Sequence, residues 1–221
     1  MRRVLVIAPH ADDEVLGCGG AIARYAADGW EVRVLVASAS DVLVNGRVKA
    51  SGAKRAQELS AACAILGVKT HRIAFADKEN LLDTVPMRTV IGMIQDDMEA
   101  FAPKHVYLPL PSHHQDHRIV YDAAMAALRP GGMAVKPSLV AAYEYTYTGW
   151  HVRPSADTGF LYKDIGATLD AKRRAWRAYG SQGREPAHPL SEEAIVALAR
   201  TRGFEAGCLY AERFTIIRLI D

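Results

Sequence analysis

Two short stretches of the sequence concentrate histidine and carboxylate side chains. The first spans residues 9–14 and the second residues 113–117, and each follows a run of apolar residues, at 4–7 and 106–110. Such runs predict buried parallel strands, whose carboxyl ends meet at one edge of a sheet. Two imidazoles and a carboxylate can converge there. Three protein ligands with an open position for water are typical of catalytic zinc, whereas structural zinc normally has four ligands and several cysteines.

The spacing in the first stretch separates its side chains into different roles. His10 and Asp13 are three residues apart at a predicted helix start, so both can face one side while Asp12 points elsewhere. One acid can therefore bind a metal ion while the other accepts a proton from metal-activated water.

The second stretch repeats this spacing. His114 and His117 are also three residues apart, so one can bind a metal while the other reaches the substrate. Asp116 lies between them, and a carboxylate beside imidazoles is a typical orienting partner that fixes the tautomer. Each stretch alone also has an ordinary structural explanation, because acids cap helix starts and histidines occur on surfaces and in cores. Together they favour a metal site.

The elements that would position these residues alternate between strands and helices. Strands are predicted at 4–7, 32–36, 72–75, 106–110, 139–147, 160–165 and 214–220. Helices are predicted from the acids 12–14 to Gly29, at 50–66, at 87–101, from Ser112 with Gln115 as its capping-box partner, at 170–179 and at 191–202. This pattern predicts an α/β fold: a single-domain, Rossmann-like three-layer sandwich over residues 1–221, with a mostly parallel sheet and helices on both faces. The polar connections 38–49 and 77–85 are expected to wall the ligand site.

Composition and charge restrict the class of partner. The chain has 221 residues, 50% of them hydrophobic, and a formal net charge of +2, with no basic or acidic cluster that would indicate binding to nucleic acid or a membrane surface. Its apolar runs are too short for a membrane span or a signal peptide. Three widely spaced cysteines favour reduced thiols and a cytoplasmic location. A small-molecule substrate is therefore expected, and a homo-oligomer is left open.

The first stretch also carries a family resemblance. Residues 8–14, Ala-Pro-His-Ala-Asp-Asp-Glu, with glycines at 17, 19 and 20, resemble the A-H-P-D-D-E signature of the PIG-L / LmbE-like zinc-dependent N-acetylglucosaminyl de-N-acetylases. Residues 114–117 match the H-x-D-H motif of that family. Pro9 and Ala11 depart from the usual pattern, but neither position carries a ligand. Similarity continues at 55–58, 66–67, 77, 172, 181–182 and 210–214, and so covers nearly the whole chain.

This resemblance implies a hydrolase that removes an N-acetyl group from an amino sugar or another N-acetylglucosamine-containing small molecule. The implied zinc ligands, which also suit another divalent metal such as Fe²⁺, are His10, Asp13 and His117. Asp12 would be the general base. His114, oriented by Asp116, would stabilise the oxyanion or protonate the leaving amine. Arg55 and Asp77 would contact substrate hydroxyls.

Two other functions fit parts of the pattern. His10, Asp12 and His117 also match the facial triad of non-haem iron oxygenases, although many of those enzymes carry it on antiparallel barrel strands rather than at a strand-to-helix junction. A nucleotide-binding module would place glycine in the first strand-to-helix turn, where this chain has acids that repel phosphate. The iron oxygenase is kept as the alternative function.

Overall fold

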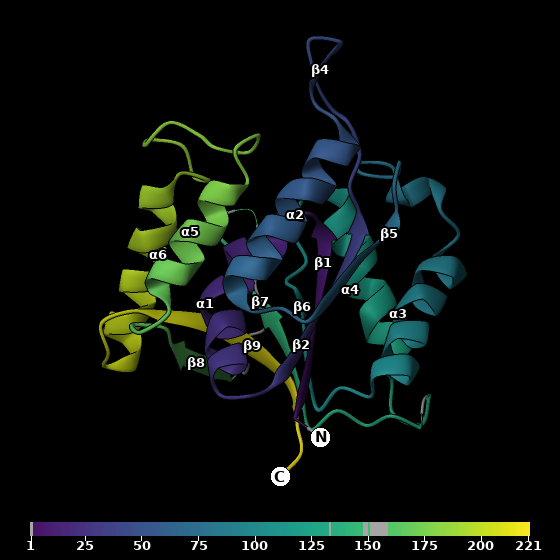
Figure 1. Cartoon of the computed structure of the whole chain (residues 1–221). Helices are drawn as coiled ribbons and strands as arrows, with labels where there is room; N and C mark the ends of the chain where they lie inside the picture. The colour runs from purple at the N-terminus through teal and green to yellow at the C-terminus, as the bar shows by residue number, and fades with distance from the viewer. Residues whose placement is uncertain (1, 133, 148–149, 151–158) are drawn as a thin grey trace.

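The computed structural model describes residues 2–132, 134–147, 150 and 159–221, which build a seven-stranded sheet (Figure 1). Its strands lie in the order β5-β2-β1-β6-β7-β9-β8. Strands β5, β2, β1, β6 and β7 are parallel, and β9 is antiparallel to both of its neighbours, β7 and β8. These strands are β1 Arg3–His10, β2 Glu31–Ser38, β5 Thr70–Phe75, β6 His105–Pro109, β7 Leu139–Tyr143, β8 Phe160–Asp164 and β9 Ala211–Leu219. The helices are α1 Asp13–Ala27, α2 Gly52–Leu66, the short 3-10 turn η1 Leu82–Thr84, α3 Met87–Phe101, α4 Gln115–Ala127, α5 Leu169–Ala178 and α6 Glu192–Ala206.

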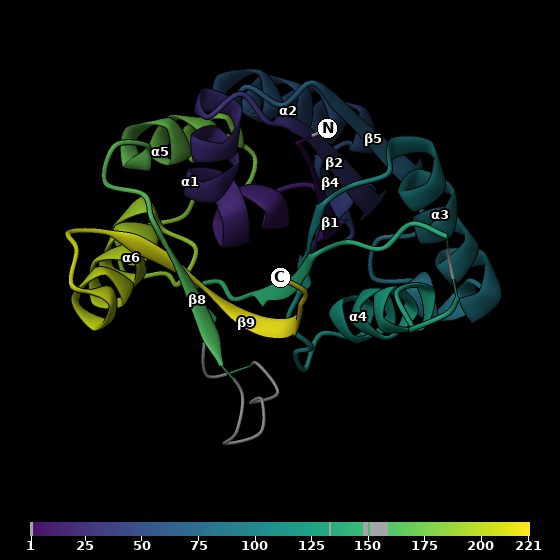
Figure 2. The same cartoon turned by 90° about the horizontal axis from the view of Figure 1, so that it is seen from below.

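Helices cover both faces of this sheet (Figure 2). One buried cluster joins α1, α2 and α5 to one face, and a second joins α3 and α4 to the other. Successive residues of β1 belong to opposite clusters, Val4 and Val6 to the first and Leu5 and Ile7 to the second. A strand buried on both faces must be apolar throughout, which is why β1 shows no polar alternation. The predicted α/β fold with a mostly parallel sheet between two helix layers is confirmed.

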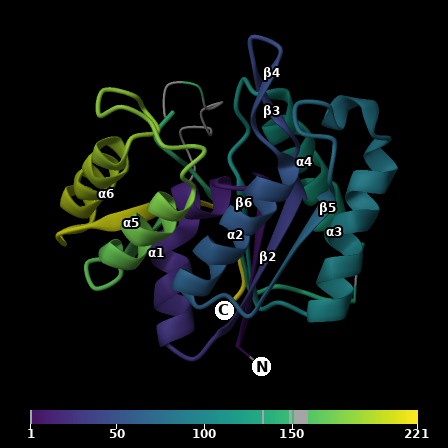
Figure 3. The same ribbon diagram turned by 45° about the horizontal axis from the view of Figure 1, so that its top comes forward.

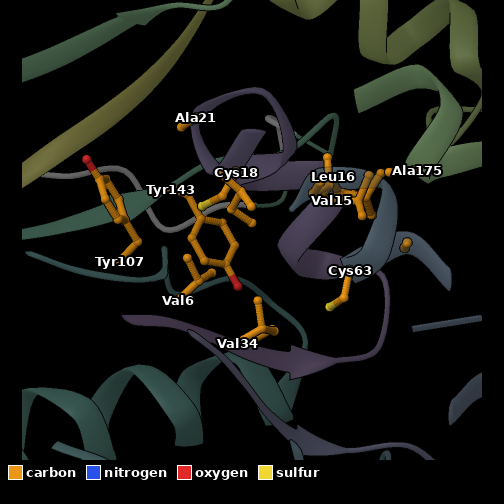
Figure 4. Packing of buried hydrophobic residues seen from close by; sticks show 14 of the residues in the cluster. Val6, Val15, Leu16, Cys18, Ala21, Val34, Cys63, Tyr107, Tyr143 and Ala175 are labelled. Carbon is orange, nitrogen blue, oxygen red and sulfur yellow. The ribbon is translucent and has the colours of Figure 1, made fainter. Parts of the chain in front are cut away.

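Helix α1 packs closely against its neighbours because glycines face them. A Cβ atom at Gly17 would lie 2.1 Å from the Tyr143 ring, and one at Gly20 would lie 2.6 Å from Ile165. Figure 4 shows the Tyr143 ring packed beside α1, next to Cys18. The Tyr143 hydroxyl donates to the Ile7 carbonyl at 3.0 Å, so the ring is fixed between β1 and α1.

A buried ion pair ties α1 to α5 and to β9. Lys172 of α5 and Glu212 of β9 lie 2.6 Å apart, and each side chain is 4% exposed. The Glu212 carboxylate also accepts the backbone N–H groups of Gly20 and Ala21, while Lys172 donates to the Leu16 carbonyl. Each buried charge thus has several polar partners, which offsets its desolvation.

Local structure differs from the sequence predictions in several places. The polar connection predicted at 38–49 contains most of an antiparallel hairpin, β3 Val42–Val44 and β4 Arg47–Ala50, which projects beyond α2 in Figure 3. Its turn is formed by Asn45 and Gly46, both with positive φ, as a tight hairpin requires. The strand expected at 139–147 ends at Tyr143. Among the helices that the structure describes, none is both long and apolar enough to cross a bilayer.

The close approach of α1 predicts a stability difference between two glycine-to-alanine variants. Gly17→Ala forces the Tyr143 ring or α1 to move, so we expect a loss of about 1–3 kcal/mol in the free energy of unfolding. Gly92 of α3 has no atom within 4 Å of an added Cβ, so Gly92→Ala should instead be neutral or stabilise by up to about 1 kcal/mol. Urea denaturation of both variants checks this, and equal stability would contradict the packing described.

Candidate metal centre and active site

The two polar stretches meet at the carboxyl edge of the sheet. Strand β1 ends at His10 and pairs in parallel with β6, so the loops that follow both strands lie side by side. The ring centroid of His10 lies 4.9 Å from that of His114 and 5.4 Å from that of His117. The predicted convergence of the two stretches is what the fold produces.

One carboxylate oxygen lies between two imidazole nitrogens. Asp13 Oδ2 is 3.5 Å from His10 Nδ1 and 3.4 Å from His117 Nε2, and all three residues are buried. Zinc bonds of about 2.0–2.2 Å in a tetrahedral arrangement separate neighbouring ligand atoms by about 3.3–3.5 Å. The donor types and their separations therefore fit a divalent metal ion with an open fourth position.

The Asp116 carboxylate bonds to His10, whereas the sequence predicted that it would orient His114. Asp116 Oδ2 accepts from His10 Nε2 at 2.8 Å, and the carboxylate also accepts the backbone N–H groups of Asn80 and Leu82. Those N–H groups belong to the segment after β5 and hold the carboxylate against His10. Because a carboxylate only accepts, Nε2 carries the proton and Nδ1 is left for the metal.

Burial and neighbouring charges shift the pKa values of both His10 and Asp13. Burial lowers the pKa of His10, but hydrogen bonds to Asp116 and Asp13 outweigh it and raise the pKa to about 10. Burial raises the pKa of Asp13, yet His117 and His10 lower it to about 2. A metal ion bound here must therefore displace a proton from His10, and the carboxylate is ionised throughout the neutral range.

Asp12 is held apart from this ligand set. It is the N-cap residue of α1, with φ 137°, but its side chain caps no helix N–H group. Its carboxylate lies 3.7 Å from Arg55 Nη2 and is buried. Burial and the charge of Asp13 raise the pKa of Asp12 well above its usual range. The Asp12 side chain is thus not used as a helix cap, and it stays the candidate for the general base.

His114 caps the start of α4, where Ser112 had been expected to do so. His114 Nδ1 accepts the backbone N–H of Asp116 at 3.2 Å, and Ser112 Oγ accepts the N–H of His114. The proton of His114 is therefore on Nε2, which donates to Asn80 Oδ1 at 2.9 Å. Burial and the neighbouring His10 lower the pKa of His114, so the ring is neutral and presents an N–H donor.

Arg55 and Asp77, the two expected substrate contacts, lie in different surroundings. The Arg55 side chain is 2% exposed, forms an ion pair with Glu79 and donates to the Ala11 carbonyl at 2.6 Å. Asp77 is 81% exposed, with Lys78 3.9 Å away. Contact of either residue with a substrate stays a prediction, and the structure gives Arg55 a second task in holding the Asp12 turn.

Sequence reasoning missed Glu79 and Asn80. Glu79 joins Arg55 to the backbone N–H of Ser40, and Asn80 joins His114 to Asp116. Their segment had been expected to wall the site because it is polar and follows a predicted strand. No residue pattern distinguished these two side chains from Asp77, because the positive φ of Asn80 and the direction of the loop appear only in the fold.

Comparison with known proteins identifies the family. The model of the PIG-L family, described as GlcNAc-PI de-N-acetylase, matches residues 5–128. This chain belongs to the PIG-L family. Both polar stretches lie inside the matched segment, so the metal-ligand candidates and Asp12 are part of it.

Several proteins that are similar to this PIG-L chain are named as deacetylases. A diacetylchitobiose deacetylase of Thermococcus kodakarensis is 26% identical, with 96% of this chain and 82% of the relative covered. A 1D-myo-inositol 2-acetamido-2-deoxy-alpha-D-glucopyranoside deacetylase of Rhodococcus jostii is 28% identical, with 82% of each covered. The solved N,N'-diacetylchitobiose deacetylase of Pyrococcus horikoshii superposes with a TM-score of 0.75 at 25% identity, covering 98% of this chain and 84% of that one.

The bond from His10 to Asp116 predicts a defect in metal binding. Asp116→Asn replaces a charged acceptor by a neutral amide and weakens the orientation of His10, so metal affinity should fall about 10–100-fold. Asp122→Asn, at an exposed position on the same helix, is the matched control and should bind metal like the unchanged protein. Titration of the apoprotein with Zn²⁺ measures both, and equal affinities would remove Asp116 from the site.

Proposed function

We propose that this chain is a zinc-dependent hydrolase that removes the acetyl group from the nitrogen of an amino sugar. The observation that carries the proposal is the meeting of His10, Asp13 and His117 around one point, with the separately held Asp12 beside them, in a PIG-L-family chain. The named relatives act as deacetylases, which supports hydrolysis and not the oxygenase alternative. The facial triad of that alternative would need Asp12 among the ligands, whereas Asp13 lies between the two histidines.

The side chains divide the reaction between them. A bound zinc ion would lower the pKa of water and polarise the acetamide carbonyl. Asp12 accepts a proton from the water whose oxygen bonds to the carbonyl carbon, and that proton passes to nitrogen as the C–N bond breaks. His114 donates from Nε2 to the carbonyl oxygen once its bond to Asn80 is exchanged for one to the substrate. The products are acetate and a free amine.

A row of aromatic side chains that begins at His117, and an exposed tryptophan beside His113, support a sugar as the substrate. The Tyr145 ring packs on His117 with centroids 5.3 Å apart, and Tyr147 continues this row outward at 6.1 Å from Tyr145. Trp150 is 62% exposed, and its ring centroid lies 5.8 Å from that of His113. Its backbone carbonyl accepts the backbone N–H of His113. Aromatic rings offer apolar faces against which the C–H face of a sugar ring can pack.

The two neighbouring acids should separate metal binding from turnover. Asp12→Asn keeps the shape of the side chain but cannot accept a proton, so it should retain zinc and lose on the order of a hundredfold or more in turnover. Asp13→Asn should instead lose zinc, because a neutral amide is a poor ligand. Chelation should abolish acetate release from N-acetylated sugars, and added Zn²⁺ should restore it. Metal analysis with an acetate assay decides the matter, and the reverse pattern in the two variants would refute the assignment.

The exposed tryptophan predicts a change in substrate binding without a change in chemistry. Trp150→Ala removes an aromatic face beside His113, so KM for N,N'-diacetylchitobiose should rise about tenfold while kcat stays within about twofold. Phe204→Ala, which removes a similarly exposed aromatic side chain from α6, is the control and should change neither constant. Equal KM values for Trp150→Ala and the unchanged enzyme would place the sugar elsewhere.

A further inference from the structure

One peptide unit next to the candidate base is held from both sides. The carbonyl of Ala11 accepts from Arg55 Nη2 at 2.6 Å, and the N–H of Asp12 donates to Glu14 Oε2 at 3.0 Å. Ala11 and Glu14 are 0% exposed and Arg55 is 1% exposed. Water therefore does not compete for either hydrogen bond, and the plane of this peptide is set by two buried side chains.

The backbone at this position needs such support. Asp12 has φ 137° and ψ −28°, a combination that residues with a Cβ atom rarely adopt. Strained residues of this kind persist only when surrounding groups over-determine the conformation. The direction of the Asp12 Cα–Cβ bond is set by this peptide plane together with φ, so a change in either would redirect the carboxylate.

Glu14, which accepts the Asp12 N–H, is itself held by a residue far away in the sequence. Tyr179, which directly follows α5, donates from its hydroxyl to Glu14 Oε1 at 2.5 Å, while Glu14 Oε2 accepts from Asp12. Tyr179 is 0% exposed, and its ring belongs to the cluster that joins α1, α2 and α5. Glu14 thus has one oxygen for the Asp12 turn and one for Tyr179, so the packing of α5 fixes the rotamer of Glu14.

We propose that Glu14 and Tyr179 are positioning residues that hold the Asp12 carboxylate in the direction required of the general base. The Glu14 carboxylate bonds to the Asp12 N–H and to Tyr179, and by this proposal both side chains act through the Ala11–Asp12 peptide without touching the substrate. The proposal rests on the function proposed above for Asp12. It assigns a task to the last acid of the first polar stretch and to an aromatic residue 165 positions away from it.

Removal of one hydroxyl tests this proposal. Tyr179→Phe keeps the buried ring but releases Glu14, so kcat should fall by about tenfold to a hundredfold while KM and zinc content stay within about twofold. Tyr107→Phe is the matched control, since it removes another buried hydroxyl, which bonds to the Tyr25 hydroxyl at 2.8 Å. It should keep full kcat. An unchanged kcat in Tyr179→Phe, or equal losses in both variants, would overturn the proposal.

The double variant Asp12→Asn with Tyr179→Phe distinguishes a positioning role of Tyr179 from a general loss of structure. In Asp12→Asn there is no base left to position, so adding Tyr179→Phe should change the remaining turnover by less than about twofold. A further drop as large as that in the unchanged background would show that Tyr179 acts by another route, and would refute the assignment. Glu14→Gln keeps an acceptor for the Asp12 N–H and should retain more activity than Glu14→Ala.

Hydrogen exchange tests the same contact without turnover. The Asp12 amide should exchange at least about tenfold faster in Tyr179→Phe than in the unchanged protein, and no faster in Tyr107→Phe. If the unchanged, zinc-loaded protein releases no acetate from N-acetylated sugars, the proposed function has failed, and this measurement still decides the positioning role. An Asp12 amide that exchanges equally in all three proteins would refute it.

Discussion

Charged side chains at the carboxyl edge of the sheet form pairs that join segments far apart in the chain, and most of these side chains are buried. His10 of β1 bonds to Asp116 of α4, and Arg55 of α2 pairs with Glu79 of the loop after β5. An ionised group buried without a partner is strongly destabilising, and breaking such a pair costs about 3–5 kcal/mol. The elements can therefore pack only in the arrangement that brings each charge to its partner. The same arrangement brings the candidate metal ligands together.

The packing of helix α1 in the core determines where its first turn lies in the site. Its glycines let it approach Tyr143 and Ile165, and Glu212 and Lys172 bond to its backbone from β9 and α5. Its position along the sheet is consequently fixed by contacts well away from Asp13. Because the first turn of α1 supplies Asp13, its packing determines how far that carboxylate lies from the histidines.

Two adjacent aspartates acquire different properties from these surroundings. Asp13 accepts from the backbone N–H of His10 and lies against two imidazoles, which lower its pKa. Asp12 is turned by an unusual backbone conformation towards Arg55, and burial beside Asp13 raises its pKa. Identical side chains are thus suited to binding a cation and to accepting a proton. A difference of this kind depends on the direction in which each carboxylate points, and a turn held by buried hydrogen bonds preserves that direction.

The sequence by itself determined the layer order of the fold and the residue types at its site. Apolar runs that show no polar alternation required strands buried on both faces, and polar residues directly after two of them had to meet at one edge, since parallel strands end on the same side. Only the tertiary structure decided the partners of those residues. The Asp116 carboxylate bonds to His10 while it also accepts the backbone N–H groups of Asn80 and Leu82. Hydrogen-bond partners depend on distances and angles between segments brought together by packing, and residue order along the chain does not contain those distances.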